Sequence, residues 1–358
     1  MGNEPVRSAT VLKSSSGSAP LLDRKLPFSR IGFALSLTIF VVAALVLYRI
    51  LRDIDPDELV AAIRRTDRGT LVIAGGFVAA GYLTLTFYDL FALRTIGRYE
   101  LPYWVAALGG FTSYAIGHSV GASVFSGGAV RYRIYSGWGL SVVEVTKICF
   151  VAGLTFWLGN VTVLGLGILY TPEAAQAIDQ LPLWINRGFA LVLLALLAAY
   201  VIWVWVKPRV IGRDDWQLKL PGGPLTLLQI AIGIVDLACC AAAMYMLMPN
   251  EPNVGFVTAA VIFVAATLLG FASHAPGGLG VFDAAMLVAF YQFDKEDLLA
   301  GLLLFRLLYY VIPFVLSLFV LGIHEALQHG SVVASVPEAV GAPSGAGTQY
   351  DGEPSEPR

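Results

Sequence analysis

The stretch 273–280, with the sequence SHAPGGLG, lies inside an uncharged run of 31 residues, 252–282. A second uncharged run, 101–130, is 30 residues long and contains GHSVG at 117–121 and SGG at 126–128. As straight helices these runs would be about 45 Å long at 1.5 Å per residue, whereas the hydrocarbon core of a bilayer is about 30 Å thick. Glycine and proline disfavour a continuous helix. We therefore predict that each run forms a broken, re-entrant helical hairpin.

The composition of the chain indicates a membrane protein. Of its 358 residues, 57% are apolar and 13% are Asp, Glu, Lys or Arg, with a net charge of −2; an ordinary soluble protein has about 25% charged residues. These values exclude a soluble enzyme, a secreted disulfide scaffold and a nucleic-acid binder. The three cysteines, Cys149, Cys239 and Cys240, lie in apolar runs, so we interpret them as packing residues.

Six further apolar segments are long enough to cross a bilayer once. They are 31–48, 71–88, 148–172, 188–206, 225–248 and 298–323. We therefore predict an all-α, polytopic integral membrane protein with about six full spans and two re-entrant hairpins. The membrane domain is expected to cover 28–327, between tails at 1–27 and 328–358 whose composition predicts disorder.

The distribution of basic residues orients these elements, because Lys and Arg are enriched on the cytoplasmic side. With both hairpins re-entrant, the N-terminal tail and the loop 207–219 lie inside, as do both termini, and the loop 173–186 lies outside. The loop 52–68 carries four arginines and five acidic residues; we expect an interfacial helix there.

The same topology predicts an internal repeat of opposite orientation. The halves cover about 28–172 and 183–327, and their Gly-Gly pairs, 127–128 and 277–278, are 150 residues apart. Inverted repeats with broken helices that meet near the midplane are typical of transporters.

The first candidate site is the segment 123–133. Gly127 and Gly128 would let the backbone approach a ligand closely, Ser126 would add a donor, and Arg131 and Arg133 could bind a phosphate through their planar guanidinium groups. An anionic headgroup would fit this set. The alternative is that both arginines are topology anchors that reach the cytoplasmic surface.

The second candidate site is the segment 274–283. Pro276, Gly277, Gly278 and Gly280 break the helix, and the helix that restarts near Gly280 directs its positive dipole end into the membrane. We expect the glycine loop to line a site and Asp283 to cap the restarted helix.

Ionisable residues within the apolar segments form a third group of candidates, because such groups usually face a protein interior or a wet cavity. They are Asp89, His118, Glu144, Lys147, Asp236 and Arg306. Glu144 and Lys147 have the i, i+3 spacing of a pair on one helix face, and Asp236 could pair with Arg306 across the bundle.

Other chemistry is not expected. Tyr309 and Tyr310, near Arg306, could be polar lining or ordinary packing, and we favour packing. His324 and His329 have i, i+5 spacing, which places them on different helix faces, unlike the zinc-protease motif. We find no Walker loop and no cluster of metal ligands, and therefore expect no cofactor, no metal and no ATP-driven pump.

The segments FSGGAVRYRIYS at 125–136 and PGGLGVFD at 276–283 resemble the transmembrane flippase portion of the lysylphosphatidylglycerol synthetase/flippase family, the multiple peptide resistance factor proteins. The resemblance covers about residues 28–327. It implies a membrane domain that moves aminoacylated phosphatidylglycerol from the inner to the outer leaflet. The matching positions are Ser126 to Arg133 and Pro276 to Gly280. No aminoacyl-transferase domain follows the last span, so we expect no lipid synthesis and no enzyme activity.

These observations together predict a lipid flippase in the bacterial inner membrane. Arg131 and Arg133 would recruit a phosphate on the cytoplasmic side, and Asp236 and Glu144 could balance a cationic headgroup. The alternatives are a carrier of another amphipathic phosphate, such as a polyprenyl-linked intermediate, and a non-transporting scaffold for a separately encoded lipid-modifying enzyme. The partners expected are membrane phospholipid, such an enzyme or a second copy of the chain, and no nucleic acid.

Overall fold

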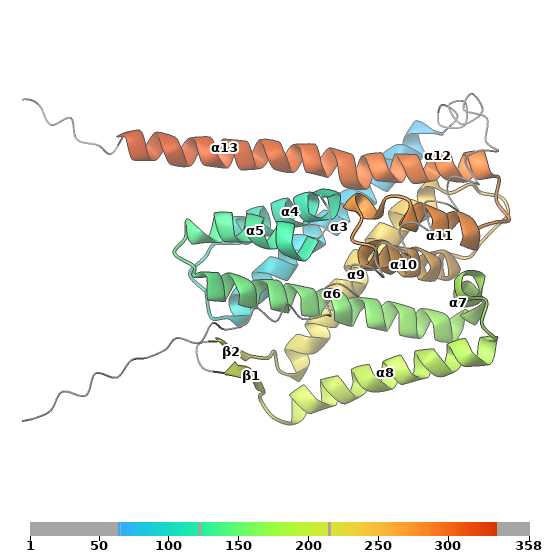
Figure 1. The fold of residues 1–358 in the computed structure, drawn as a ribbon, viewed down its shortest axis with the longest axis horizontal. Helices are drawn as coiled ribbons and strands as arrows, with labels where there is room; N and C mark the ends of the chain where they lie inside the picture. Colours follow the sequence, from blue (N-terminus) through green and yellow to red (C-terminus); the bar gives the residue numbers. More distant parts are fainter. Residues whose placement is uncertain (1–63, 65, 121–122, 214–215, 335–358) are drawn as a thin grey trace, which may run out of the picture.

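The computed structural model describes residues 64, 66–120, 123–213 and 216–334, and this part of the chain is almost entirely helical (Figure 1). Five helical segments within it are long and apolar enough to cross a membrane. They are α3 (Arg68–Thr95), α6 (Val142–Tyr170), α8 (Leu183–Val206), α9 (Gly223–Leu247) and the continuous segment Lys295–Ile323. The last comprises α12 (Lys295–Arg306), a π-helical turn η2 (Leu307–Val311) and the start of α13 (Ile312–Ala334). The all-α polytopic prediction is confirmed.

Several predictions near the ends of the chain lie outside the described residues. They concern the tail 1–27, the span 31–48, most of the loop 52–68 and the tail from 335 onward. The helix α13 ends at Ala334, so it continues past residue 327, where we expected the membrane domain to end.

Both long uncharged runs are broken, as predicted. The first forms α4 (Tyr103–Val120) and α5 (Ser123–Ser136). The second forms α10 (Phe256–Ala272), the 3₁₀ turn η1 (Pro276–Gly278) and α11 (Val281–Ala289). The second break depends on glycine, because Gly277, Gly278 and Gly280 have φ values of 58°, 62° and 81°, which side chains with a Cβ rarely adopt. The side of the membrane from which each hairpin enters stays a prediction.

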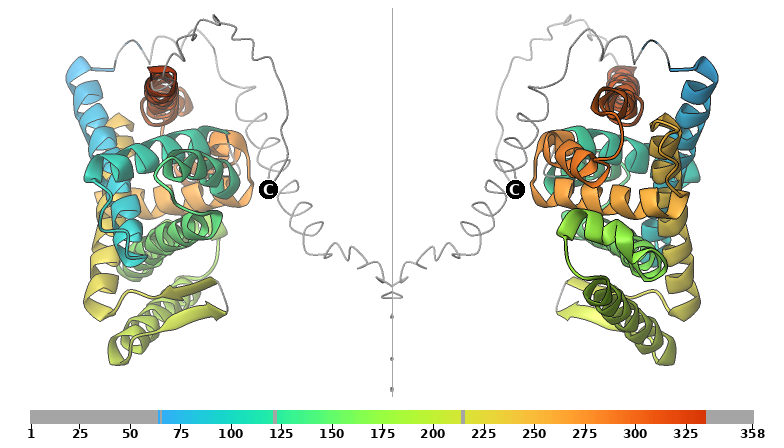
Figure 2. Two further views of the ribbon diagram at one scale, coloured as in Figure 1. Left: turned by 90° about the vertical axis from the view of Figure 1, so that its left-hand side faces the viewer. Right: turned by 90° about the vertical axis from the view of Figure 1, so that its right-hand side faces the viewer.

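The order of elements repeats along the chain: α3, α4–α5 and α6 are followed by α9, α10–α11 and α12–α13. Figure 1 shows the two hairpins end to end, between α6 on one side and α12–α13 on the other. Figure 2 shows α3 and α9 side by side along one edge of the bundle, where they pack on each other. This order is compatible with the predicted repeat, while the repeat itself and its inverted orientation in a membrane stay predictions.

Two connections have more structure than we expected. The predicted outer loop contains α7 (Pro172–Asp179), which begins with a proline at a position where a missing N–H costs nothing. The predicted inner loop contains an antiparallel pair, β1 (Val210–Arg213) and β2 (Trp216–Lys219), in which Val210 faces Lys219. The buried Leu218 anchors this pair to the bundle.

The helices α6 and α9 cross with their backbones in contact. A Cβ on Gly159 would lie 2.7 Å from the Cα of Gly233, and the reverse distance is 2.8 Å. Beside the crossing, the Gln229 amide donates to the Thr155 hydroxyl at 2.9 Å. Small residues and interhelical hydrogen bonds are the means by which helices associate in membranes, so this crossing holds the two halves of the domain together.

We expect Gly159→Ala to destabilise the protein by about 1–3 kcal/mol, because the added methyl overpacks the crossing. The measurement is thermal unfolding of the purified protein in detergent. Gly153→Ala is the matched control on the same helix, since a Cβ there meets nothing within 4 Å. Equal melting temperatures for the two variants would contradict the close backbone contact of α6 and α9 at Gly159.

Candidate functional site

A cavity of about 470 Å³ lies where the breaks of the two hairpins meet. The turn η1 packs against α4, which closes one side, and α6 forms another wall through Ala152, Gly153 and Phe156. The two hairpins contribute most of the remaining lining. From the first hairpin come Ser113, Tyr114, Gly117, His118, Val124, Phe125 and Arg131, and from the second come Thr267, Gly270, Phe271, His274, Gly277, Gly278 and Phe282.

Arg131 is the one Asp, Glu, Lys or Arg among the described residues that line this cavity, and its guanidinium is paired with Asp89. Its Nε lies 3.0 and 3.1 Å from the two carboxylate oxygens, and its Nη2 lies 2.7 Å from Oδ1. The Tyr135 hydroxyl also donates to Asp89, at 2.7 Å, and the Tyr114 ring lies 4.7 Å from the guanidinium carbon. Arg131 is therefore a buried, ion-paired residue, and its interpretation as a surface anchor is wrong.

The position of Arg131 depends on a close approach between α4 and α5. A Cβ on Gly127 would lie 3.0 Å from the carbonyl oxygen of Ser113 and 3.6 Å from Nη1 of Arg131. A larger residue at 127 would push α5 outward and move the guanidinium. The predicted need for glycine here is thus explained by helix packing beside the cavity.

A second ion pair supports the loop of the other hairpin. Arg306, at the end of α12, donates from Nε to Asp283 Oδ1 at 2.9 Å and from Nη2 to Oδ2 at 2.6 Å. Its Nη1 donates to the carbonyl of Gly277 at 3.0 Å. Asp283 also accepts from the backbone N–H of Gly280 at 3.1 Å, which confirms the predicted cap of α11. One arginine thus connects the glycine loop, α11 and α12.

The expected pair between Asp236 and Arg306 is wrong. Asp236 is 4% exposed and accepts a hydrogen bond of 3.0 Å from the Tyr88 hydroxyl, between α9 and α3. Arg306 instead reaches Asp283, which is on the neighbouring helix of its own half. The spacing of residues along the chain could not tell which helices lie next to each other.

The expected pair between Glu144 and Lys147 is also wrong. Glu144 binds Arg98 at 2.7 Å and forms a capping box with Ser141 at the start of α6. Hydrogen bonds to Glu100 and Glu144 raise the pKa of Arg98 above its usual value. None of these residues is among those that line the cavity.

Two polar atoms in the cavity wall have no hydrogen-bond partner among the described residues. They are the Ser113 hydroxyl, on a residue that is 1% exposed, and Nδ1 of His118. The imidazole of His118 lies among rings, with centroids 5.5 Å from Tyr114 and 6.2 Å from Tyr309. Buried polar groups are nearly always satisfied, and both atoms are free to form hydrogen bonds with a polar group in this cavity.

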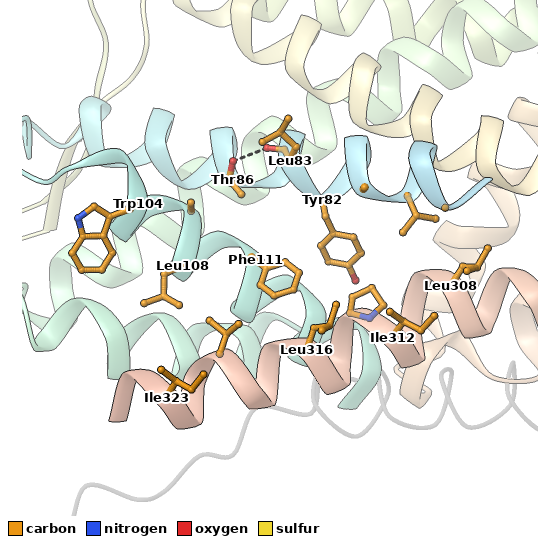
Figure 3. A pocket seen from close by; sticks show the side chains of 16 residues that line it. Tyr82, Leu83, Thr86, Trp104, Leu108, Phe111, Leu308, Ile312, Leu316 and Ile323 are labelled. Atoms are coloured by element: carbon orange, nitrogen blue, oxygen red, sulfur yellow. Dashed lines mark hydrogen bonds between the residues drawn. The ribbon is translucent and has the colours of Figure 1, made fainter. Parts of the chain in front are cut away.

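A second, apolar groove of about 790 Å³ lies between α3, α4 and α13 (Figure 3). Leu83, Trp104, Leu108, Leu316 and Ile323 line it, among others. The hydroxyl of Thr86 is turned back to the carbonyl of Leu83 at 2.6 Å, so it presents little polarity to the groove. The lining suits a hydrocarbon chain.

An aromatic layer lies between the groove and the central cavity. Tyr82 packs against Phe111 at 5.5 Å and against Tyr309 at 5.4 Å, and its hydroxyl donates to the carbonyl of Tyr309 at 2.9 Å. Tyr309 then stacks on His118. Tyr310 packs against Phe305 and Tyr309 and also lines the cavity.

The structure brings together only some of the predicted site residues. His118, Arg131, Gly277 and Gly278 line the cavity. Not among the lining residues are Ser126, Gly127 and Gly128 of α5, Pro276 of η1, and Gly280, Asp283 and Arg306, although Arg306 donates to the carbonyl of the lining residue Gly277. Arg133 is exposed on α5, and Glu144, Lys147 and Asp236 are not among the lining residues.

Sequence reasoning missed Ser113 and Tyr114. One signal could have found Tyr114, because it precedes His118 by four residues and so shares its helix face.

Comparisons with known proteins agree with the resemblance noted in the sequence. The model of the lysylphosphatidylglycerol synthase transmembrane region matches residues 31–317. An uncharacterised protein of Synechocystis is 32% identical over 72% of this chain and 80% of its own length. The inner membrane protein YbhN of Escherichia coli is 31% identical over 78% of this chain and 87% of its own. The phosphatidylglycerol lysyltransferase of Staphylococcus aureus is 27% identical over 81% of this chain, and the match covers 33% of that protein.

Proposed function

We propose that this chain, which belongs to the lysylphosphatidylglycerol synthase transmembrane-region family, moves a phospholipid between the two leaflets of the bilayer. The role of that family is connected with membrane lipids. We place the chain in the inner membrane, as the name of the Escherichia coli relative states for that protein. No covalent step is part of this proposal, and we propose no enzyme activity for the chain.

The observation that carries the proposal is the cavity at the meeting point of two broken helices. It presents a guanidinium group and two buried polar atoms without described partners, on Arg131, Ser113 and His118. These groups can donate to phosphate oxygens, and arginine does so with planar, charge-assisted hydrogen bonds. Broken helices whose ends meet within the membrane are where transporters hold their substrates.

The surrounding structure supports the passage of a lipid. The headgroup would sit in the central cavity while its acyl chains stay in the hydrocarbon of the bilayer; the apolar groove between α3, α4 and α13 is separated from the cavity by Tyr82 and Tyr309 and could hold a second hydrocarbon chain. The ion pairs Arg131–Asp89 and Arg306–Asp283 tie each hairpin to a long helix.

We expect Gly153→Trp to reduce lipid translocation to the rate of protein-free vesicles. A Cβ on Gly153 meets nothing within 4 Å and the residue lines the cavity, so an indole there fills the cavity without straining α6. The measurement is the loss of fluorescence of a labelled phospholipid in reconstituted vesicles when a membrane-impermeant quencher is added outside.

The matched control is Gly188→Trp on α8, where a Cβ also meets nothing within 4 Å and the residue is exposed. It is expected to translocate lipid as the unmodified protein does. If the unmodified protein moves no lipid, the proposed function is wrong. If Gly153→Trp moves lipid normally, the cavity is not the binding site of the lipid headgroup.

A further inference from the structure

We infer that the central cavity selects a phospholipid with a net negative headgroup, such as a phosphate diester with an uncharged alcohol, over one that carries an added cationic aminoacyl group. This inference rests on the proposed function, because it names the class of lipid that the same cavity takes. The observation behind it is the arrangement of charges around the cavity.

The charged side chains at the cavity wall are of one sign, which is positive. Arg131 lines the cavity, and no Asp or Glu is among the described residues that do so. Its partner Asp89 is 0% exposed and is not among the lining residues. The neutralising carboxylate is therefore farther from the cavity than the cation, and since Coulomb energy falls with distance, a ligand in the cavity meets a positive potential.

The carboxylates that could bind a cationic headgroup are engaged elsewhere. Asp283 is held by Arg306 and by the N–H of Gly280. Asp236 lies between α3 and α9 with the Tyr88 hydroxyl, and Glu144 binds Arg98 at the end of α6. We expected Asp236 and Glu144 to balance a cationic headgroup, and neither lines the cavity. A buried ammonium group without a counter-ion costs several kcal/mol.

The uncharged polar atoms of the cavity wall also suit an anion, because they can donate hydrogen bonds. The Ser113 hydroxyl can donate, and so can the ring of His118 through a protonated Nδ1. With Arg131 they form a set of donors on two faces of the cavity, from α4 and α5. A phosphate accepts from every one of these groups, whereas an ammonium group accepts from none.

Binding tests the inference without any transport. The full chain in detergent is incubated with equal amounts of phosphatidylglycerol, phosphatidylcholine and lysylphosphatidylglycerol, and the bound lipid is identified by native mass spectrometry. We expect phosphatidylglycerol to be retained in excess over both others. Retention of lysylphosphatidylglycerol at least equal to that of phosphatidylglycerol overturns the inference. A failure of lipid translocation in vesicles, by contrast, concerns the proposed function alone.

A charge placed in the cavity gives a second test. Gly153→Asp adds a carboxylate to the wall, and Gly153→Asn is its neutral control of the same size. We expect the ratio of bound lysylphosphatidylglycerol to phosphatidylglycerol to rise about tenfold in the aspartate variant relative to the asparagine variant. Equal ratios in the two variants overturn the inference. If the aspartate variant does not fold, the comparison of lipids on the unmodified protein decides.

Discussion

Arg131→Gln is expected to abolish lipid translocation and to destabilise the protein by about 3–5 kcal/mol, which is the usual cost of leaving one member of a buried ion pair alone. The carboxylate of Asp89 is 0% exposed and would keep only the Tyr135 hydroxyl of the partners described above. The cavity would at the same time lose the cation that faces the lipid. Both losses follow from a single guanidinium group.

The double variant Asp89→Asn/Arg131→Gln separates the two losses. Removing both charges leaves no uncompensated ion. We therefore expect the double variant to regain most of the melting temperature that Arg131→Gln loses, while lipid translocation stays absent. Arg187→Gln, an exposed arginine on α8, is the control for changing an arginine elsewhere and should behave as the unmodified protein. Normal translocation by Arg131→Gln would contradict the role of Arg131.

The second large effect is expected for Arg306→Gln. This change removes both hydrogen bonds to Asp283 and the bond to the Gly277 carbonyl, so the loop 273–280 loses its attachment to α12. We expect a loss of stability of about 3–5 kcal/mol, because Asp283 is buried and would lack its counter-ion. Translocation should fall as well, since Gly277 and Gly278 line the cavity.

Amide hydrogen exchange measures the local part of this effect. The backbone N–H groups of Gly278 and Gly280 bond to the carbonyl of Ala275 and to the carboxylate of Asp283, and both should exchange faster in Arg306→Gln. Exchange across the α6–α9 crossing is the internal reference and should change less. Unchanged exchange at residues 278 and 280 would show that Arg306 does not hold the loop.

Local features of the site could be predicted from the sequence because they depend on neighbours along the chain. The breaks within 101–130 and 252–282 follow from length and from glycine and proline content, and Asp283 follows from its place three residues after Gly280 as a helix cap. The π-helical turn at Leu307–Val311 has no such signal. It lies directly after Arg306 and contributes Tyr309 to the aromatic layer and Tyr310 to the cavity wall.

The ion pairs could not be predicted, because spacing in the sequence does not say which helices touch. Asp89 and Arg131 are 42 residues apart and belong to α3 and α5. The sequence suggested Asp236 as a possible partner of Arg306, whereas the packing of α11 beside α12 brings Asp283 to it. In a membrane the cost of an unpaired charge requires that each such residue find a partner, but only the fold decides which one.

The sequence by itself therefore determined the class of this protein and the places where its helices break. Apolar length and backbone chemistry act on the chain locally, so both can be read without a fold. The tertiary structure decided what faces the cavity, because burial and pairing depend on groups that the chain brings together from distant positions. It placed Arg131 in the cavity wall and paired it with Asp89, which is not among the lining residues, and from that arrangement comes the expected preference for an anionic lipid.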